Sequence, residues 1–283
     1  IEHSTVLRTC QALEKEGYEV TYIDVTERGV IDLEQLKNAI RNNTVVISVM
    51  YVNNETGVVQ PIDEIAEMIE GKGIVLHTDA VQGVGKEMIL PKKQGIHALS
   101  AAAHKFYGPK GTGFLYLDQN YMIEKEITGG SQERNRRSGT ENVHGIVGMA
   151  KALEIVYSDM EEEQAKEKEM QIYLEEALKK EICNIKINCG NSRRISSVVN
   201  ITLEDCNVQT LMVALDMEGI CVSGGSACMS GAMETSHVLK AMGASEEDLK
   251  SSIRVSIGRY NTKDEIDIFI QKLKEIVARE RAK

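Results

Sequence analysis

In the first half of the chain, β-branched runs alternate with helical patterns, and this alternation limits the fold more than any other feature. Pro61 opens one of the helical patterns, at a first-turn position that proline favours. Because strands joined through helices pair in parallel, the pattern predicts an α/β fold with a mostly parallel sheet covered by helices. The expected strands span residues 19–24, 44–52, 73–79, 97–103 and 112–117.

The second half of the chain predicts a smaller α+β domain. Residues 143–181 have the pattern of one long helix, or of two helices broken in the middle. Helices are also expected to begin at Ser245 and Thr262, because each is followed three residues later by an acidic residue, as in a capping box. The predicted domains are residues 1–155, a large cofactor-binding domain, and residues 156–283, a small C-terminal domain.

Composition excludes several classes of protein. A net charge of -10 and an aromatic content of 4% argue against nucleic-acid binding, which uses cationic surfaces and aromatic stacking. No apolar run approaches the length of a membrane span, and the N-terminus has no signal pattern, so we expect a cytoplasmic protein. The 6 cysteines include no CxxC pair, so we expect neither a metal site nor a disulfide framework.

Two strand-like runs lead to residues with complementary chemistry. One ends on Asp79, and the other leads to Lys105 and a glycine-rich turn. This pair suits a pyridoxal phosphate (PLP) enzyme, in which a lysine forms the Schiff base and a carboxylate keeps the pyridine nitrogen protonated. The alternatives are an ordinary surface lysine, and a turn residue or magnesium ligand at position 79.

Three further positions have both a structural and a functional interpretation. His3 precedes a helix, as an ordinary capping-region histidine or as an imidazole lying on a cofactor ring. Asn54 follows a buried strand, where it satisfies turn backbone or donates to a substrate carboxylate. Arg254 has apolar neighbours and, if buried, needs an anion, either a bound amino-acid carboxylate or an internal acidic side chain.

A segment of small residues surrounds Cys228. Such a segment cannot pack the thiol tightly, so we expect Cys228 to be accessible and able to carry sulfur between two sites. The alternative is a turn with an incidental cysteine.

Together these residues resemble the cysteine desulfurase family of the NifS/IscS type, within the class V aminotransferase group of PLP enzymes. The resemblance covers essentially the whole chain and implies PLP-dependent transferase fold type I, as in aspartate aminotransferase. The matching motifs are residues 2–3, 52–57, 79–82, 104–111, 137–142, 225–228 and 252–254.

The resemblance implies roles for the residues that would hold the cofactor. Lys105 would be the Schiff-base lysine, and His3 would stack on the pyridine ring as an acid/base group. Asp79 would pair with the ring nitrogen and Gln82 with the ring hydroxyl, while His104 would help to hold the phosphate.

The resemblance also implies a reaction and partners. Asn54 and Arg254 would grip the carboxylate of L-cysteine, and Cys228 would take its sulfur as a persulfide and leave L-alanine. Thr140 would reach the phosphate of the other subunit in a homodimer. The sulfur would pass to an acceptor such as an iron–sulfur scaffold protein; no nucleic-acid or membrane partner is expected.

Two departures from the family pattern keep other functions open. The resemblance starts at His3, so we expect the chain to lack the family's N-terminal segment, and Ala102 stands where the family usually has a phosphate-binding serine. The alternatives are a non-catalytic relative that acts as a dimerisation or scaffold-binding module, and another PLP reaction, such as that of a selenocysteine lyase or an aminotransferase.

Overall fold

The computed structural model describes residues 1–225 and 235–282. Across these residues, no helix combines the length and apolar character needed to span a membrane. The chain forms two compact units, which we name by their sheets and describe separately. The four-stranded unit comprises residues 41–51 and 62–160, and the three-stranded unit comprises residues 1–40, 52–61 and 161–283.

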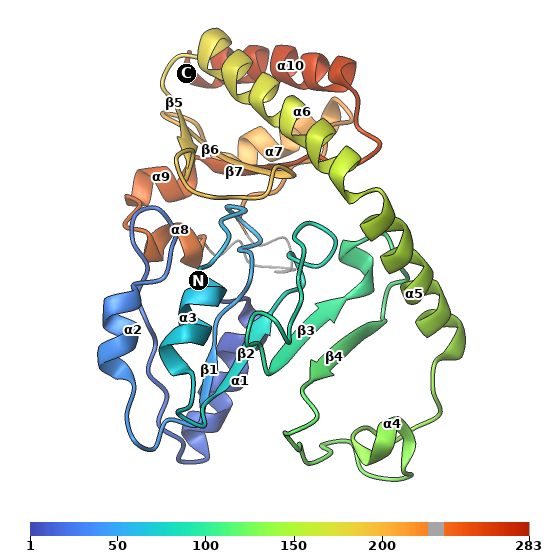
Figure 1. The fold of residues 1–283 in the computed structure, drawn as a ribbon. Helices are drawn as coiled ribbons and strands as arrows, with labels where there is room; N and C mark the ends of the chain where they lie inside the picture. The colour runs from blue at the N-terminus through green and yellow to red at the C-terminus, as the bar shows by residue number, and fades with distance from the viewer. Residues whose placement is uncertain (226–234, 283) are drawn as a thin grey trace. The chain divides into compact units, whose positions relative to one another are not determined.

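The four-stranded unit is built on a mostly parallel sheet of order β1-β2-β3-β4 (Figure 1). The first three strands are parallel to one another, and β4 runs antiparallel to β3. This arrangement confirms the predicted α/β class. The elements are β1 (Val46–Ser48), α3 (Ile62–Ile69), β2 (Val75–Asp79), β3 (Ala98–Ala102), the 3-10 helix η1 (Ala103–Lys105), β4 (Gly113–Leu117), α4 (Gln132–Asn135) and α5 (Val143–Ser158).

A row of polar side chains crosses the parallel part of this sheet. The ring of His77 on β2 lies between two serine hydroxyls, with Nδ1 2.8 Å from Ser48 Oγ on β1 and Nε2 2.9 Å from Ser100 Oγ on β3. Alternate residues of a strand share a face, so Asp79 lies on the same face as His77. Burial lowers the pKa of His77, and the nearby charge of Asp79 opposes part of that effect.

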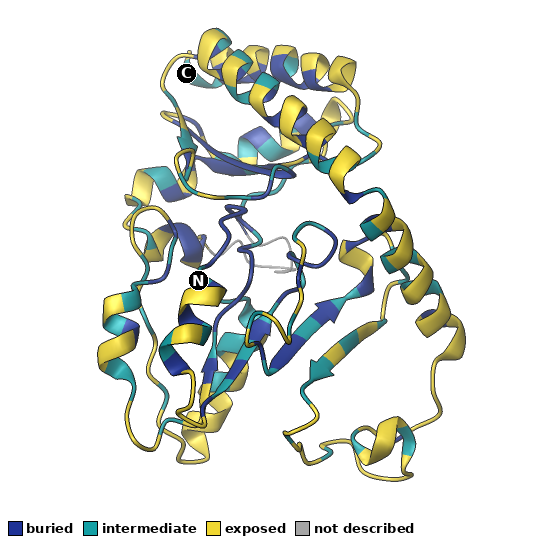
Figure 2. Cartoon of the chain, in the orientation of Figure 1, coloured by how far each residue is buried: buried dark blue, intermediate teal, exposed yellow. Residues whose placement is uncertain are grey.

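The three-stranded unit holds an antiparallel sheet of order β5-β6-β7. Every residue of its central strand is buried, as the dark colour of β6 shows in Figure 2. Its elements are α1 (Ser4–Lys15), α2 (Leu33–Ala39), β5 (Ile185–Asn188), β6 (Val198–Leu203), α7 (Val208–Met217), α8 (His237–Ala241), α9 (Glu246–Lys250), β7 (Ser252–Ser256), α10 (Lys263–Arg281) and, from residue 161 on, α6 (Met160–Glu181).

The last helix contributes an apolar stripe to the core of this unit. Its start is fixed by a capping box, in which Thr262 Oγ1 accepts from the Glu265 amide and Glu265 Oε2 accepts from the Thr262 amide. The stripe joins one core cluster with side chains of α6, β6 and α7. The buried stripe residues are Ile266, Phe269, Ile270, Leu273, Ile276 and Val277.

Several sequence predictions can be compared with these elements. Residues 143–181 form two helices, α5 and α6, separated at Asp159. The expected strand at 19–24 is wrong: none of its residues is buried, and the nearest pairing is an isolated bridge between Val25 and Ile31. Alternation alone does not make a strand when no neighbouring strand offers its backbone groups. The division into domains at 1–155 and 156–283 stays a prediction.

We expect Leu273→Ala to lower the free energy of unfolding by about 2–5 kcal/mol, because Leu273 is fully buried and its truncation leaves a cavity. Urea unfolding monitored by circular dichroism measures the change. Ile268→Ala on the same helix is the matched control, since Ile268 is 53% exposed, and it should change stability by less than about 0.5 kcal/mol. Equal effects of the two variants would contradict the packing described here.

The lowered pKa of His77 predicts a loss of stability in acid. Below the ordinary histidine value of 6.5, the unfolded chain binds a proton that folded His77 resists, so the free energy of unfolding falls as the pH drops. His77→Asn removes this titrating group. Between neutral and mildly acidic pH, the free energy of unfolding should therefore fall less in the variant than in the original protein. Urea unfolding at both pH values checks this, and an unchanged fall would exclude His77 as its source.

Candidate active site

In the four-stranded unit, Asp79 and Lys105 follow from the ends of two neighbouring parallel strands. Asp79 closes β2 and lies opposite Ser100 of β3, and η1 follows β3 directly and ends with Lys105. Gly108 makes the next turn possible, because a Cβ there would lie 2.9 Å from the Ala103 Cβ. Asp79 therefore lies at the carboxyl end of one parallel strand and Lys105 just beyond that of the next, where α/β proteins place their binding sites.

The two side chains differ in how they are held. Asp79 is half-buried, and its Oδ1 accepts a hydrogen bond of 3.0 Å from the Val81 amide. Lys105 is exposed, and across residues 1–225 and 235–282 its amine has no hydrogen bond or ion pair. Gln82 is half-buried in the turn that follows Asp79. The site thus offers an oriented carboxylate and an unpaired amine, the groups that the sequence singles out.

His104, next to Lys105, is exposed on η1. Desolvation lowers its pKa, and the positive charges of Lys105 and Lys110 lower it further. An imidazole in this setting is neutral at physiological pH, and its own protonation would be favoured by an incoming anion.

The three-stranded unit brings together two other predicted residues, Asn54 and Arg254. Arg254 lies on β7, where its backbone pairs with Ser223 in an isolated bridge. Its Nη1 donates to the Asn54 carbonyl oxygen at 2.8 Å. Asn53 shapes the turn that carries Asn54, since its Oδ1 accepts from the amides of Glu55 at 2.9 Å and Thr56 at 3.0 Å. The turn thus orients the half-buried arginine.

The structure says less about the roles of the three remaining candidate residues. His3 is the N-cap of α1, where its Nδ1 accepts from the Thr5 amide at 3.3 Å, so the capping interpretation is seen directly and the ring-stacking role stays a prediction. Thr140 is exposed between α4 and α5. Cys228 lies outside the residues that the structure describes.

Three polar residues near these groups carry no role in the sequence analysis. His77 and Ser100 belong to the row beside Asp79, and their signal was polar side chains at alternate positions of an otherwise apolar strand. Glu55 belongs to the motif at residues 52–57, in which only Asn54 is predicted to have a function. The structure shows Glu55 fully buried. A charged residue inside an apolar, strand-ending segment is a signal that could have found it.

Comparisons with known proteins agree on one family. The sequence model of the aminotransferase class-V family matches residues 1–269. The cysteine desulfurase IscS of Clostridium botulinum strain Hall is 43% identical over 283 residues, which cover 99% of this chain and 71% of the relative.

Solved structures give the same answer. A NifS-like protein has a TM-score of 0.91 and 35% identity, with 98% of this chain and 73% of that chain covered. A structure described as SspA in complex with cysteine has a TM-score of 0.79 and 34% identity, with 93% of this chain and 72% of that chain covered.

The fold, the paired strand ends and these matches define a member of the aminotransferase class-V family, whose members are PLP-dependent enzymes. Within that family, the chain belongs to the cysteine desulfurases of the NifS/IscS type.

The pKa of His104 provides a test of its expected contact with phosphate. In protein without cofactor, we expect a pKa below the ordinary 6.5, and Lys110→Ala should raise it because one repelling charge is lost. Binding of PLP should also raise it, since a phosphate anion favours the charged imidazolium. NMR titration of the ring measures all three values. A His104 pKa that does not respond to PLP would contradict the phosphate role.

Proposed function

We propose that this chain removes sulfur from L-cysteine in a PLP-dependent reaction, releasing L-alanine and leaving a persulfide on Cys228. The single observation that carries the proposal is that Asp79 and Lys105 follow from the carboxyl ends of two adjacent parallel strands, in a cysteine desulfurase sequence. The structure described as SspA in complex with cysteine supports the choice of substrate.

The residues of the four-stranded unit fit the cofactor by their chemistry. Lys105 has the unpaired amine needed for a covalent link to the PLP aldehyde, and Asp79 has a carboxylate to pair with the ring nitrogen. Gln82 would bind the ring hydroxyl, and His104 the phosphate. When bound, PLP supplies an electron sink that labilises bonds at the Cα of an amino acid.

The residues of the three-stranded unit would bind the substrate and move protons. The Arg254 guanidinium would hold the cysteine carboxylate by its fork of donors, with Asn54 beside it. His3 would stack on the cofactor ring and exchange a proton as an acid/base group. The backbone bridge to Ser223 and the bond to the Asn54 carbonyl would keep the guanidinium oriented.

The electrons in the proposed sulfur transfer balance without an added oxidant. The Cys228 thiolate attacks the substrate sulfur, an S–S bond forms, and the bond between that sulfur and the substrate Cβ breaks. The electron pair of the broken bond stays on the substrate carbon, which takes up a proton and leaves as part of L-alanine. The persulfide on Cys228 would then be passed to an acceptor, such as an iron–sulfur scaffold protein.

We also propose a homodimer in which Thr140 reaches the cofactor phosphate of the partner subunit. Exposed apolar side chains on α5, which begins three residues after Thr140, support a subunit interface there. Val143 is 64% exposed and Val147 is 62% exposed. A cytoplasmic location remains a prediction.

Lys105→Ala should abolish the visible absorption of the PLP-loaded protein, because the covalent link needs this amine. Alanine release from cysteine should fall by at least about 100-fold. Absorbance spectroscopy and an alanine assay measure the two effects, and Lys93→Ala, which removes another exposed lysine of the same unit, is the control. A Lys105→Ala protein that keeps both the colour and the activity would exclude Lys105 as the catalytic lysine.

Cys228→Ser should leave the visible absorption intact and lower alanine release by at least about 100-fold, because a hydroxyl cannot accept sulfur as a thiolate does. Cys183→Ser is the control, since Cys183 is an exposed cysteine to which the proposed reaction gives no role, and it should be replaceable without loss. Mass spectrometry of the protein after reaction with cysteine locates the persulfide. Alanine release that survives in Cys228→Ser would exclude Cys228 as the sulfur acceptor and favour a lyase reaction that needs no thiol, whereas a 2-oxo acid formed in place of alanine would indicate transamination.

A further inference from the structure

Gly225 and Ser236, which lie on either side of residues 226–234, come together at Glu55. A Cβ built on Gly225 would lie 3.5 Å from the Ser236 Cβ and 3.8 Å from Glu55 Oε2. The Gly225 backbone has a φ of +76°, a conformation that suits glycine. Two residues that flank the Cys228 segment, Gly225 and Ser236, therefore lie beside one carboxyl group.

The contact between Glu55 and Ser236 is direct. Ser236 Oγ donates to Glu55 Oε2, and the same hydroxyl accepts from the Leu239 amide at 3.0 Å as the N-cap of α8. Glu55 is 0% exposed, and its second oxygen, Oε1, has no hydrogen-bond partner among the described residues. A buried carboxyl group held by so few bonds destabilises a fold, which makes a purely structural role a poor explanation.

The backbone of Glu55 is fixed from both sides. Its amide donates to Asn53 Oδ1 at 2.9 Å, and its carbonyl oxygen accepts from Asn200 Nδ2 at 3.2 Å. The carbonyl of neighbouring Asn54 accepts from Arg254, whose backbone pairs with Ser223, only two residues before Gly225. The turn at 53–56 thus holds the chain on both sides of the Cys228 segment.

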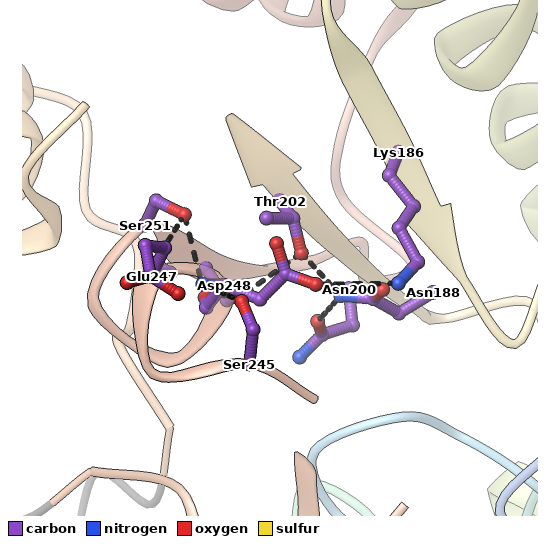
Figure 3. A network of polar contacts seen from close by, with 9 residues as sticks. Lys186, Asn188, Asn200, Thr202, Ser245, Glu247, Asp248 and Ser251 are labelled. Atoms are coloured by element: carbon purple, nitrogen blue, oxygen red, sulfur yellow. Dashed lines mark hydrogen bonds and ion pairs between the residues drawn. The ribbon is translucent and has the colours of Figure 1, made fainter. Parts of the chain in front are cut away.

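Asn200 in turn belongs to a polar network on the three-stranded sheet, which Figure 3 shows. Its hydrogen bond to the Glu55 carbonyl connects that network to the turn. Asn188 Nδ2 donates to Asn200 Oδ1 at 2.7 Å and to Thr202 Oγ1 at 2.8 Å. At the far side of the network, Lys186 pairs with Asp248 at 3.4 Å. Side chains on two adjacent strands thus support the residue that holds Glu55.

We infer that Glu55 is a positioning residue for the sulfur-transfer step: through Ser236 it fixes the base of the segment that carries Cys228. The inference rests on the proposed function, in which Cys228 attacks the substrate sulfur. Nucleophilic attack needs the thiolate within a narrow range of distance and angle, whereas binding of cysteine does not depend on this thiol. Loss of the anchor should therefore lower kcat and leave KM unchanged.

The test compares Glu55→Ala, Ser236→Ala, the double variant and Glu55→Gln in PLP-loaded protein. Alanine release should show a kcat about tenfold lower in each alanine variant, with KM for cysteine and the visible absorption unchanged. The double variant should lose no more than the single ones, because both remove the same contact. Glu55→Gln should keep most of the rate, since its amide oxygen can still accept from Ser236.

Two further measurements separate positioning from general damage. Glu167→Ala removes another buried carboxylate of the same unit, on α6, and should leave kcat unchanged. Hydrogen exchange of the Leu239 amide, which Ser236 Oγ protects, should become faster in Glu55→Ala and stay slow in Glu55→Gln.

The outcomes distinguish this inference from the proposed function. If the original protein binds PLP and releases alanine but Glu55→Ala keeps its kcat, the inference is wrong and the proposed function stands. Multiplicative losses in the double variant would likewise overturn it. If the original protein releases no alanine, the proposed function fails. If Glu55→Ala does not fold, Ser236→Ala and Glu55→Gln still decide the matter through kcat and Leu239 exchange.

Discussion

Parallel pairing of β2 with β3 is the constraint on which the chemistry of the four-stranded unit depends. The register sets Asp79 opposite Ser100, and the Ala80 amide donates to the Ser100 carbonyl at 2.9 Å, which extends the pairing past the end of β2. A shift of one residue would turn Asp79 to the opposite face of the sheet. The row formed by Ser48, His77 and Ser100 opposes such a shift, because its hydrogen bonds exist in one register only.

In the three-stranded unit, the corresponding constraint is the rigidity of the irregular turn at residues 53–56. Asn53 contributes to this rigidity because its Oδ1 accepts hydrogen bonds from the amides of Glu55 and Thr56, an arrangement that replaces the regular partners of a helix or strand. Buried polar groups of this kind restrict a segment to one conformation when they are satisfied. The rigid turn holds Arg254 through the Asn54 carbonyl and Ser236 through the Glu55 carboxyl group.

The sequence predicts what depends on local pattern and misses what depends on distant contacts. Parallel strands, the capped α10 and its apolar stripe follow from periodicity and capping residues. Segment 19–24 has the same alternation, but among the described residues no strand pairs with it, which no local pattern reveals. Asp79 and Lys105 were found because strand ends can be recognised, whereas the bond between Glu55 and Ser236 joins residues 181 positions apart and only the folded chain creates it.

The antiparallel pairing of β4 with β3 gives Lys105 a particular kind of support. Ala102 lies opposite Gly113, and the Ala103 amide donates to the Thr112 carbonyl at 3.0 Å, so the segment between them leaves and re-enters the sheet at the same place. Its backbone therefore forms a hairpin that is closed at its base by pairing within the sheet. The Lys105 side chain reaches a partner by rotation about its own flexible carbon–carbon bonds, while pairing with β4 holds the backbone from which it extends.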